Sequence, residues 1–214
     1  MHNKIILFDW GGIVENHIDS ENGWFVTTEK LIKRLSNGKH DKLDVWSRFE
    51  VDGRQVHICT VNKDYELDKW IESVSRLYDF NVTKEEFLKA YEEEYDNVVY
   101  YKDVVNYIHS LKNRCRIGVL SNLIILDKKR LDKQVDLSKF DKVFLSFELG
   151  LIKPNKDIYE KVTELLGIDG KDILFFDDRL DNVEGARSCG WQAYQASGER
   201  LEDIKEKVEE FLSN

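Results

Sequence analysis

Several features that define common classes of protein are scarce in this sequence of 214 residues. It has only three cysteines, and none of them forms a CxxC pair, so neither a zinc knuckle nor a disulfide framework is indicated and a reducing compartment is expected. Its apolar runs are a few residues long, whereas a membrane-spanning helix needs about 20, so we expect no membrane contact. With one proline and 12 glycines, the chain also has no linker composition that would mark a domain boundary.

Positive charge is also in deficit. The 32 Lys and Arg residues stand against 41 Asp and Glu residues, which gives a formal net charge of −9 and a field that repels nucleic acid. The N-terminus lacks the apolar region and cleavage site of a signal peptide, so a cytoplasmic location is expected. The hydrophobic content of 42%, with 12% aromatic residues, is typical of a folded chain and excludes a disordered one.

Five short apolar segments have the composition of buried strands, and helical patterns separate the later ones. Strands that alternate with helices of this length form right-handed crossovers in a parallel sheet covered on both faces. The sequence therefore predicts an α/β fold. The predicted strands are residues 5–8, 116–120, 143–147, 173–176 and 193–196.

Residues 16–98 interrupt this alternation, because they contain helical patterns and no convincing parallel strand. Thr83 followed by Glu86 predicts a capping box at the start of one of these helices. For residues 51–61 the sequence leaves two structures open, a loop or a two-stranded excursion. The aromatic side chains of this stretch favour core packing over a substrate pocket. They are Trp24, Phe25, Trp46, Phe49 and Trp70.

Polar side chains follow four of the predicted strands, where the carboxyl ends of a parallel sheet meet and ligands bind. Carboxylates brought so close together repel one another unless a divalent cation lies among them, and oxygen ligands favour Mg²⁺ over zinc. A carboxylate beside a bound phosphoryl group is also a plausible nucleophile. The segments are Asp9-Trp10-Gly11-Gly12, Ser121-Asn122, Lys153-Pro154 and Asp177-Asp178 with Asp181-Asn182.

These four segments, in this order, resemble the motifs of the haloacid dehalogenase superfamily. The matching stretches are ILFDWGGIV from Ile6, VLSN from Val119, GLIKP from Gly150 and FFDDRLDNVEGA from Phe175. The resemblance implies a Rossmann-like parallel sheet core with an inserted helical cap. It places the core at residues 1–15 and 99–214 and the cap at residues 16–98, which would cover the site and select the substrate.

The resemblance also implies a metal site. Asp9 would be both the nucleophile and a Mg²⁺ ligand, and the backbone carbonyl of Gly11 would be a second ligand. Asp178 would be the direct acidic ligand of the fourth motif, with Asp177 beside it or acting through a water molecule. The cofactor that follows from these ligands is Mg²⁺.

The remaining motif residues would handle the phosphoryl group. Ser121, together with Asn122, would bind its oxygens, and Lys153 would neutralise both Asp9 and the phosphate. Water would then attack the aspartyl-phosphate and release inorganic phosphate. The resemblance thus implies a Mg²⁺-dependent phosphomonoester hydrolase acting on a small phosphorylated metabolite such as a sugar phosphate.

The sequence departs from the family pattern at Gly11, where related phosphatases have a second Asp that protonates the leaving group. Loss of such acid–base help costs on the order of 10²–10⁴ in rate unless the leaving group is good. Glu15, His17 and the cap are candidate replacements. Two alternatives therefore stay open: a metal-independent 2-haloacid dehalogenase, which the paired acids disfavour, and a non-catalytic phosphate-binding or regulatory protein.

Overall fold

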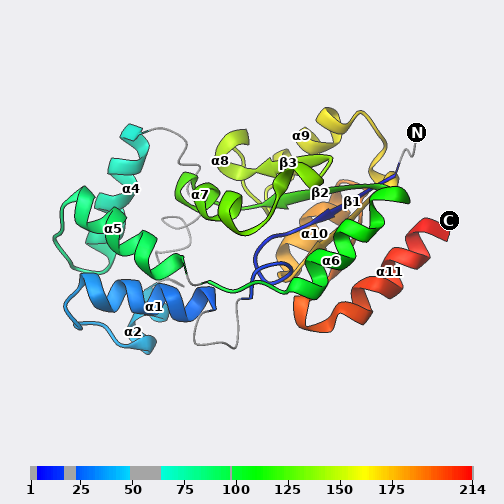
Figure 1. The fold of residues 1–214 in the computed structure, drawn as a ribbon. Coiled ribbons are helices and arrows are strands. Elements are labelled where there is room, and N and C mark those ends of the chain that lie inside the picture. Colours follow the sequence, from blue (N-terminus) through cyan, green and yellow to red (C-terminus); the bar gives the residue numbers. More distant parts are fainter. Residues whose placement is uncertain (1–3, 17–22, 49–63, 97, 214) are drawn as a thin grey trace.

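The structure is a computed structural model that describes residues 4–16, 23–48, 64–96 and 98–213. A five-stranded sheet with the order β3-β2-β1-β4-β5 forms the half of the molecule that carries both termini (Figure 1). All its neighbouring strands are parallel, which confirms the α/β fold. The strands are β1 (Ile5–Phe8), β2 (Arg116–Ser121), β3 (Lys142–Leu145), β4 (Ile173–Asp177) and β5 (Gln192–Gln195).

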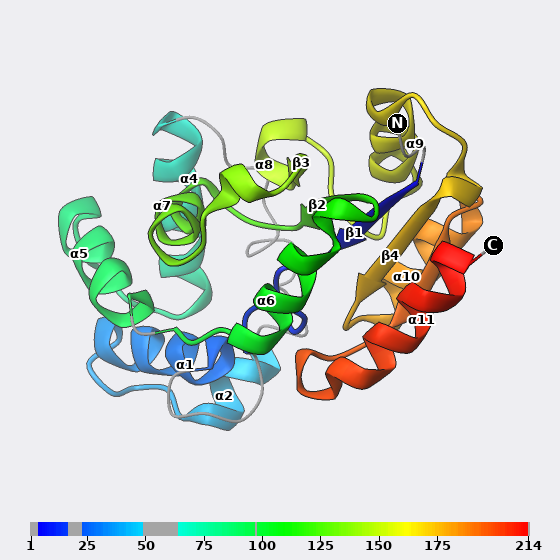
Figure 2. The ribbon, with the colours of Figure 1, turned by 45° about the vertical axis from the view of Figure 1, so that its right-hand side comes forward.

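The sheet is covered on both faces, as its apolar strands require. All four residues of β1 are fully buried, because alternate side chains enter two different apolar clusters. Helices α6 (Lys102–Ser110) and α11 (Leu201–Ser213) contribute to one cluster. Helices α9 (Lys156–Leu166) and α10 (Leu180–Ser188) contribute to the other (Figure 2). This three-layer arrangement fixes the position of the sheet's carboxyl edge.

The third strand is shorter than its apolar run predicts. Residues 143–147 were expected to be extended, but β3 ends at Leu145, and Ser146 begins the short helix α8 (Ser146–Leu149). The Ser146 hydroxyl accepts from the Leu123 N–H and donates to the Leu123 carbonyl, each at 3.0 Å. This contact with the loop after β2 turns the chain out of the sheet, so the prediction was wrong for the last two residues.

A set of helices that we call the helical insert lies between β1 and β2 in the chain, at the end of the molecule away from the termini (Figure 1). It comprises α1 (Trp24–Leu35), α2 (Lys42–Arg48), α4 (Asp64–Leu77) and α5 (Lys84–Tyr95). The predicted capping box of Thr83 and Glu86 is present at the start of α5. The predicted excursion at residues 51–61 and Phe49 lie outside the described residues.

The insert packs around an apolar cluster of its own. Trp70 is buried in this cluster, whereas Trp24 and Trp46 pack against it while partly exposed. Helix α7 (Ile125–Gln134) follows β2, yet Ile124 belongs to the same cluster. The remaining helical turns are η2 (Leu111–Asn113), η3 (Leu137–Lys139), η4 (Gly170–Asp172) and η5 (Gly198–Arg200).

The two chain segments that connect the insert to the sheet lie side by side. The Asn16 N–H donates to the Val99 carbonyl at 3.0 Å, and the Tyr101 N–H donates to the Val14 carbonyl at 2.8 Å. The chain thus enters and leaves the insert at one place.

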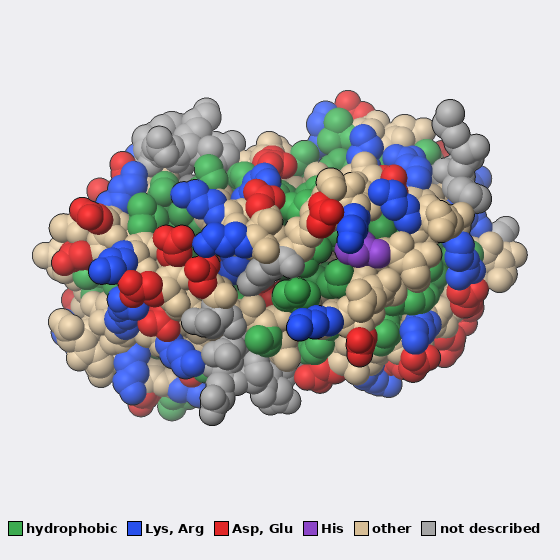
Figure 3. Space-filling model, in the orientation of Figure 1, with side chains coloured by type: hydrophobic (Ala, Val, Ile, Leu, Met, Phe, Trp, Pro, Cys, Tyr) green, Lys and Arg blue, Asp and Glu red, His purple; other side chains and the backbone are tan. Residues whose placement is uncertain are grey.

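The surface shown in Figure 3 carries basic and acidic side chains interspersed over both halves of the molecule. Among the described residues, no helix is long and apolar enough to cross a membrane.

Candidate active site

Three carboxylates converge where the strand order of the sheet reverses. Asp9 follows the last residue of β1, Asp177 is the last residue of β4, and Asp178 comes next. One oxygen from each of these side chains lies within 4.8 Å of the others. The neighbouring pair β1 and β4 flanks the reversal of strand order, which is where open parallel sheets bind ligands.

A buried ammonium group lies among these acids. The Lys153 side chain is 1% exposed, and its Nζ lies 2.6 Å from Asp177 Oδ2 and 2.9 Å from Asp9 Oδ1. Its third partner is the Leu120 carbonyl at 3.1 Å, so each of its three hydrogens has an acceptor. Burial lowers the pKa of Lys153, but the charges of Asp177 and Asp9 outweigh burial and raise this pKa above its usual value. Lys153 is therefore a cation in the site.

Asp9 is held through a single carboxylate oxygen. Its Oδ1 accepts hydrogen bonds from the Ser121 hydroxyl at 2.6 Å and from the Trp10 N–H at 2.7 Å, in addition to the contact with Lys153. Within the described part of the chain, Oδ1 makes all of the hydrogen bonds and ion pairs of this side chain. The carboxylate is thus fixed in orientation while Oδ2 remains available for bond formation.

Asp177 is surrounded by donors and is fully buried. The Asn182 amide donates to both of its oxygens, at 2.9 and 3.1 Å, and the Arg179 N–H donates to Oδ1 at 2.9 Å. With Lys153 on Oδ2, this carboxylate is bonded on both oxygens. Asn182 lies about one helical turn after the paired acids in the sequence, and this spacing is the signal that indicates the contact.

Asp178 packs against the turn that follows Asp9. Gly12 has a φ of +70°, and a Cβ at this position would lie 2.5 Å from Asp178 Cγ, so only glycine fits. Burial, and then the charges of Asp9 and Asp177, raise the pKa of Asp178 to about 8. Asp178 is thus a carboxylate whose charge the protein alone compensates poorly.

The donor set fits a hard divalent cation. Three carboxylates lie close to one ammonium group, and the pKa of Asp177, like that of Asp178, is raised first by burial. Excess negative charge on oxygen-only ligands is the chemistry that Mg²⁺ satisfies. Gly11 lies in the turn between Asp9 and Gly12, near this group of acids.

Asn122 connects the loop after β2 to the loop that carries Lys153. Its amide nitrogen donates to the Lys153 carbonyl, and its amide oxygen accepts from the Lys153 N–H, both at 2.9 Å. This two-way bond fixes the backbone from which the Lys153 side chain enters the site.

Glu15 is bonded to a basic residue outside the acidic site. It is 2% exposed and forms an ion pair with Arg130 of α7. This contact counts against Glu15 as the replacement for the missing acid. His17, another candidate replacement, lies outside the described residues.

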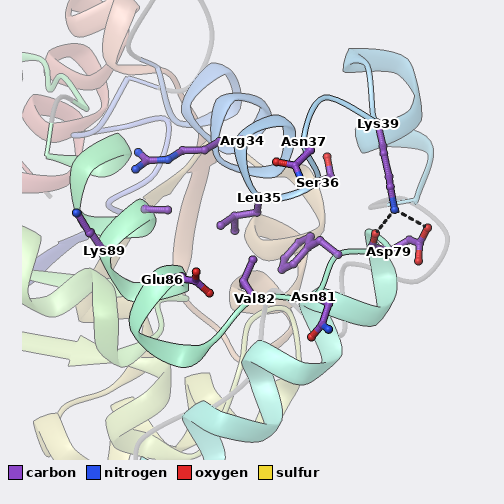
Figure 4. A pocket seen from close by; sticks show the side chains of 12 residues that line it. Arg34, Leu35, Ser36, Asn37, Lys39, Asp79, Asn81, Val82, Glu86 and Lys89 are labelled. Atoms are coloured by element: carbon purple, nitrogen blue, oxygen red, sulfur yellow. Dashed lines mark hydrogen bonds and ion pairs between the residues drawn. The ribbon is translucent and has the colours of Figure 1, made fainter.

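A separate groove of about 730 Å³ lies on the insert, between the end of α1 and the loop that precedes α5 (Figure 4). Lys39 crosses one side of it and bonds to the Asp79 carbonyl and carboxylate at 3.2 and 3.4 Å. None of the three clustered carboxylates lines this groove. It is thus distinct from the acidic site.

Comparison with known proteins identifies the family of the chain. Residues 4–190 match the family model of the haloacid dehalogenase-like hydrolases. The chain belongs to this family. It is therefore a haloacid dehalogenase-like hydrolase, and the resemblance seen in the sequence motifs is confirmed.

Solved haloacid dehalogenase-like structures share its fold. One enzyme, bt-2542 from Bacteroides thetaiotaomicron, was crystallised with magnesium and inorganic phosphate and is 22% identical, with a TM-score of 0.70 over 91% of this chain and 94% of that one. A predicted HAD-like family hydrolase from Porphyromonas gingivalis is 21% identical, with a TM-score of 0.72 over 97% and 98% of the two chains. At these identities the likeness shows the fold alone.

A curated relative is matched over a shorter length. Phosphatase MT3486 of Mycobacterium tuberculosis (strain CDC 1551 / Oshkosh) is 37% identical over 81 residues. The match covers 37% of this hydrolase and 37% of that phosphatase.

Proposed function

We propose that this hydrolase is a Mg²⁺-dependent phosphomonoesterase that uses Asp9 as its nucleophile. The observation that carries the proposal is the geometry of Asp9, whose Oδ1 is held by Ser121 and Lys153 beside the carboxylates of Asp177 and Asp178. The name of the mycobacterial relative and the phosphate bound to the Bacteroides enzyme support this class of substrate. The substrate would be a small phosphorylated metabolite, such as a sugar phosphate.

The reaction would proceed in two displacements at phosphorus. Asp9 Oδ2 attacks and forms an acyl-phosphate while the bond to the leaving alkoxide breaks, and the alkoxide takes a proton from solvent. Water then attacks the same phosphorus, which restores the Asp9 carboxylate and releases inorganic phosphate. In the substrate complex the Ser121 hydroxyl would turn from Asp9 Oδ1 to a phosphoryl oxygen, the second N–H of the Asn122 amide would bind another, and the nearby Lys153 ammonium would neutralise their charge.

The metal would be held by Asp9, the Gly11 carbonyl and Asp178, with Asp177 beside them. When bound, Mg²⁺ supplies positive charge to the phosphoryl oxygens. Asp177 keeps Lys153 in place through their 2.6 Å ion pair. The paired acids that favour this cation also count against metal-independent dehalogenation.

Glycine at position 11 would shape the substrate range. Glycine cannot donate a proton, and positioned acid–base groups contribute about 10²–10⁴ in rate. We expect the enzyme to favour phosphates with good leaving groups, such as sugar 1-phosphates and acyl phosphates, over simple alkyl phosphates. We further propose that residues 16–98 form a cap over a catalytic core of residues 1–15 and 99–214, in a cytoplasmic enzyme.

The test is phosphate release from a panel of phosphomonoesters with Mg²⁺ or with EDTA. Asp9→Asn keeps the size of the side chain and removes its nucleophilic charge, so release should fall to background. Asp169→Asn makes the same chemical change at a side chain that is 77% exposed, and should retain wild-type activity. Activity that survives either EDTA or Asp9→Asn would refute the proposal.

The alternatives give different outcomes in the same experiment. Halide release from 2-chloropropionate without Mg²⁺ would indicate a dehalogenase. Mg²⁺ binding without turnover of any substrate would indicate a phosphate-binding or regulatory protein.

A further inference from the structure

A buried polar junction joins the insert to the core at helix α7. Its centre is Asp127, which is 6% exposed, and Arg130, which is 4% exposed. Arg130 Nη2 donates to Asp127 Oδ1 at 3.1 Å, while its Nη1 donates to Glu15. Burial lowers the pKa of Arg130 to about 10, so it remains a cation at neutral pH.

Asp127 also bonds to the helical insert. The Tyr91 hydroxyl of α5 donates to Asp127 Oδ1 at 2.6 Å. Burial, and then the charge of Asp127, hold the pKa of Tyr91 well above its usual value, so the hydroxyl keeps its proton and donates. The views in Figures 1 and 2 both place α5 beside α7. Outside this buried bond, Lys133 of α7 forms exposed ion pairs with Glu92 and Asp96 of the insert.

The same carboxylate reaches the loop that leaves β2. Asp127 Oδ2 accepts from the Ile124 N–H at 3.1 Å. Ile124 lies two residues after Asn122, whose amide holds the backbone of Lys153. Asp127 therefore holds the loop that follows Ser121 and carries Asn122.

Through Arg130, the junction also reaches the turn after Asp9. Glu15 is bonded through its backbone to both ends of this turn, because its N–H donates to the Trp10 carbonyl at 2.8 Å and its carbonyl accepts from the Gly12 N–H at 2.9 Å. Three parts of the molecule thus meet at one pair of charged side chains: the insert, the loop after β2 and the turn after Asp9.

We propose that Asp127 and Arg130 are positioning residues that couple docking of helix α5 to the two loops that carry Asp9, Ser121 and Asn122. When α5 is docked, Tyr91 holds the Asp127 carboxylate in the orientation that binds Ile124 and Arg130. When α5 moves away, this carboxylate loses a buried partner and both loops become less ordered. The inference rests on the proposed function only for its effect on catalysis.

The chain provides a matched pair of variants on one helix. Tyr95 lies one turn after Tyr91 and stacks on it at a centroid distance of 4.3 Å, and both side chains are buried. The Tyr95 hydroxyl bonds to Thr28 at 2.7 Å, and because Thr28 donates its own hydrogen to the Trp24 carbonyl, Tyr95 is the donor. Tyr91→Phe therefore removes a bond to the core, and Tyr95→Phe removes an equally buried bond within the insert.

The first readout is hydrogen exchange in the full-length protein, which does not depend on activity. We expect Tyr91→Phe to speed exchange roughly 10-fold in the peptides covering residues 10–16 and 122–127, since a buried bond to a charged group is lost. Tyr95→Phe should speed exchange in α1 and α5 and leave those two peptides unchanged. Equal patterns in the two variants, or changes in Tyr91→Phe confined to α5, would overturn the proposal.

The second readout is steady-state kinetics with acetyl phosphate and with the sugar phosphate that the wild type hydrolyses best. Tyr91→Phe should raise KM about 10-fold for both substrates, because the loops that carry Asp9 and Asn122 bind the phosphoryl group that the two substrates share, whereas Tyr95→Phe should leave KM for acetyl phosphate unchanged. A loss of folded protein would instead lower kcat for both substrates by one factor. If Tyr91→Phe does not fold, Asp127→Asn replaces it in both readouts, since it removes the charge that holds Arg130. An inactive wild type would refute the proposed function while the exchange experiment still decides the coupling.

Discussion

Replacing Lys153 with Met tests whether the site is organised around one buried cation. Met has a similar length but no charge, so the change leaves Asp9 and Asp177 without the ammonium group that lies 2.9 and 2.6 Å from them. Removing one partner of a buried ion pair costs about 3–5 kcal/mol, because an uncompensated charge remains. Since Lys153 and Asp177 are 1% and 0% exposed, we expect a loss of unfolding free energy within that range.

The loss of unfolding free energy in Lys153→Met should be larger at high pH than at low pH. Burial raises the pKa of Asp177 to about 6 even with Lys153 present, against an ordinary value of 3.8, and removal of the ammonium raises it further. A carboxyl whose pKa is higher in the folded state binds protons more tightly there, so folded stability falls as pH rises from about 4 through the folded pKa. Lys153→Met should therefore be least destabilising near pH 4 and most destabilising above pH 7.

A double variant separates stability from catalysis. Lys153→Met with Asp177→Asn removes both charges of the pair, and the new amide can still accept from the Arg179 N–H, so more than half of the lost stability should return. Activity should stay reduced by about 10²–10³-fold, because the donor beside Asp9 is still missing.

The assay is urea unfolding followed by tryptophan fluorescence, in EDTA, at pH 4.5 and pH 8. A loss below about 1 kcal/mol at pH 8 for Lys153→Met would show that the buried pair contributes little. A double variant no more stable than the single variant would refute the account of Asp177 as the uncompensated charge.

Two further predictions concern the metal site. Gly12→Ala should weaken Mg²⁺ binding, measured by calorimetry, about 10–100-fold, because the new Cβ would displace Asp178. Gly38→Ala is the control, since Gly38 has a similar φ of +77° but open space around it, and it should leave the affinity unchanged; equal effects would contradict this reasoning. Mg²⁺ should raise the melting temperature more at pH 8 than at pH 6, because the pKa of Asp178 is raised to about 8 and the cation must displace the proton that this carboxyl binds at lower pH. An increase that is equal at the two pH values would exclude Asp178 as a ligand.

The sequence predicts those parts of the fold that depend on local pattern. The buried run of β1, the parallel sheet and the capping box of Thr83 follow from apolar spacing and short-range hydrogen bonds, which the sequence shows directly. The end of β3 does not follow from local pattern, because Ser146 leaves the strand to bond with Leu123 on another loop.

Local pattern does not predict contacts between distant segments either, and the contact of Lys153 with Asp9 was expected from the family resemblance alone. A lysine before a proline has the pattern of a surface residue, yet Lys153 is buried because strands β1 and β4 bring two acids to it. The ion pair of Arg130 and Glu15 joins residues 115 positions apart, and neither residue belongs to a motif. The motif residues indicated which side chains to consider, and only the three-dimensional arrangement shows what each one contacts.

The paired segments that enter and leave the insert also have a consequence for how such a chain can change. The Asn16 N–H and the Val99 carbonyl are 3.0 Å apart, and antiparallel segments paired in this way can be joined by a two-residue turn. The sheet therefore does not need the intervening helices to bring its strands together. Insertions of other lengths can begin and end at this pair of segments without changing the path of the sheet, so the insert can change in the course of evolution while the fold of the core is kept.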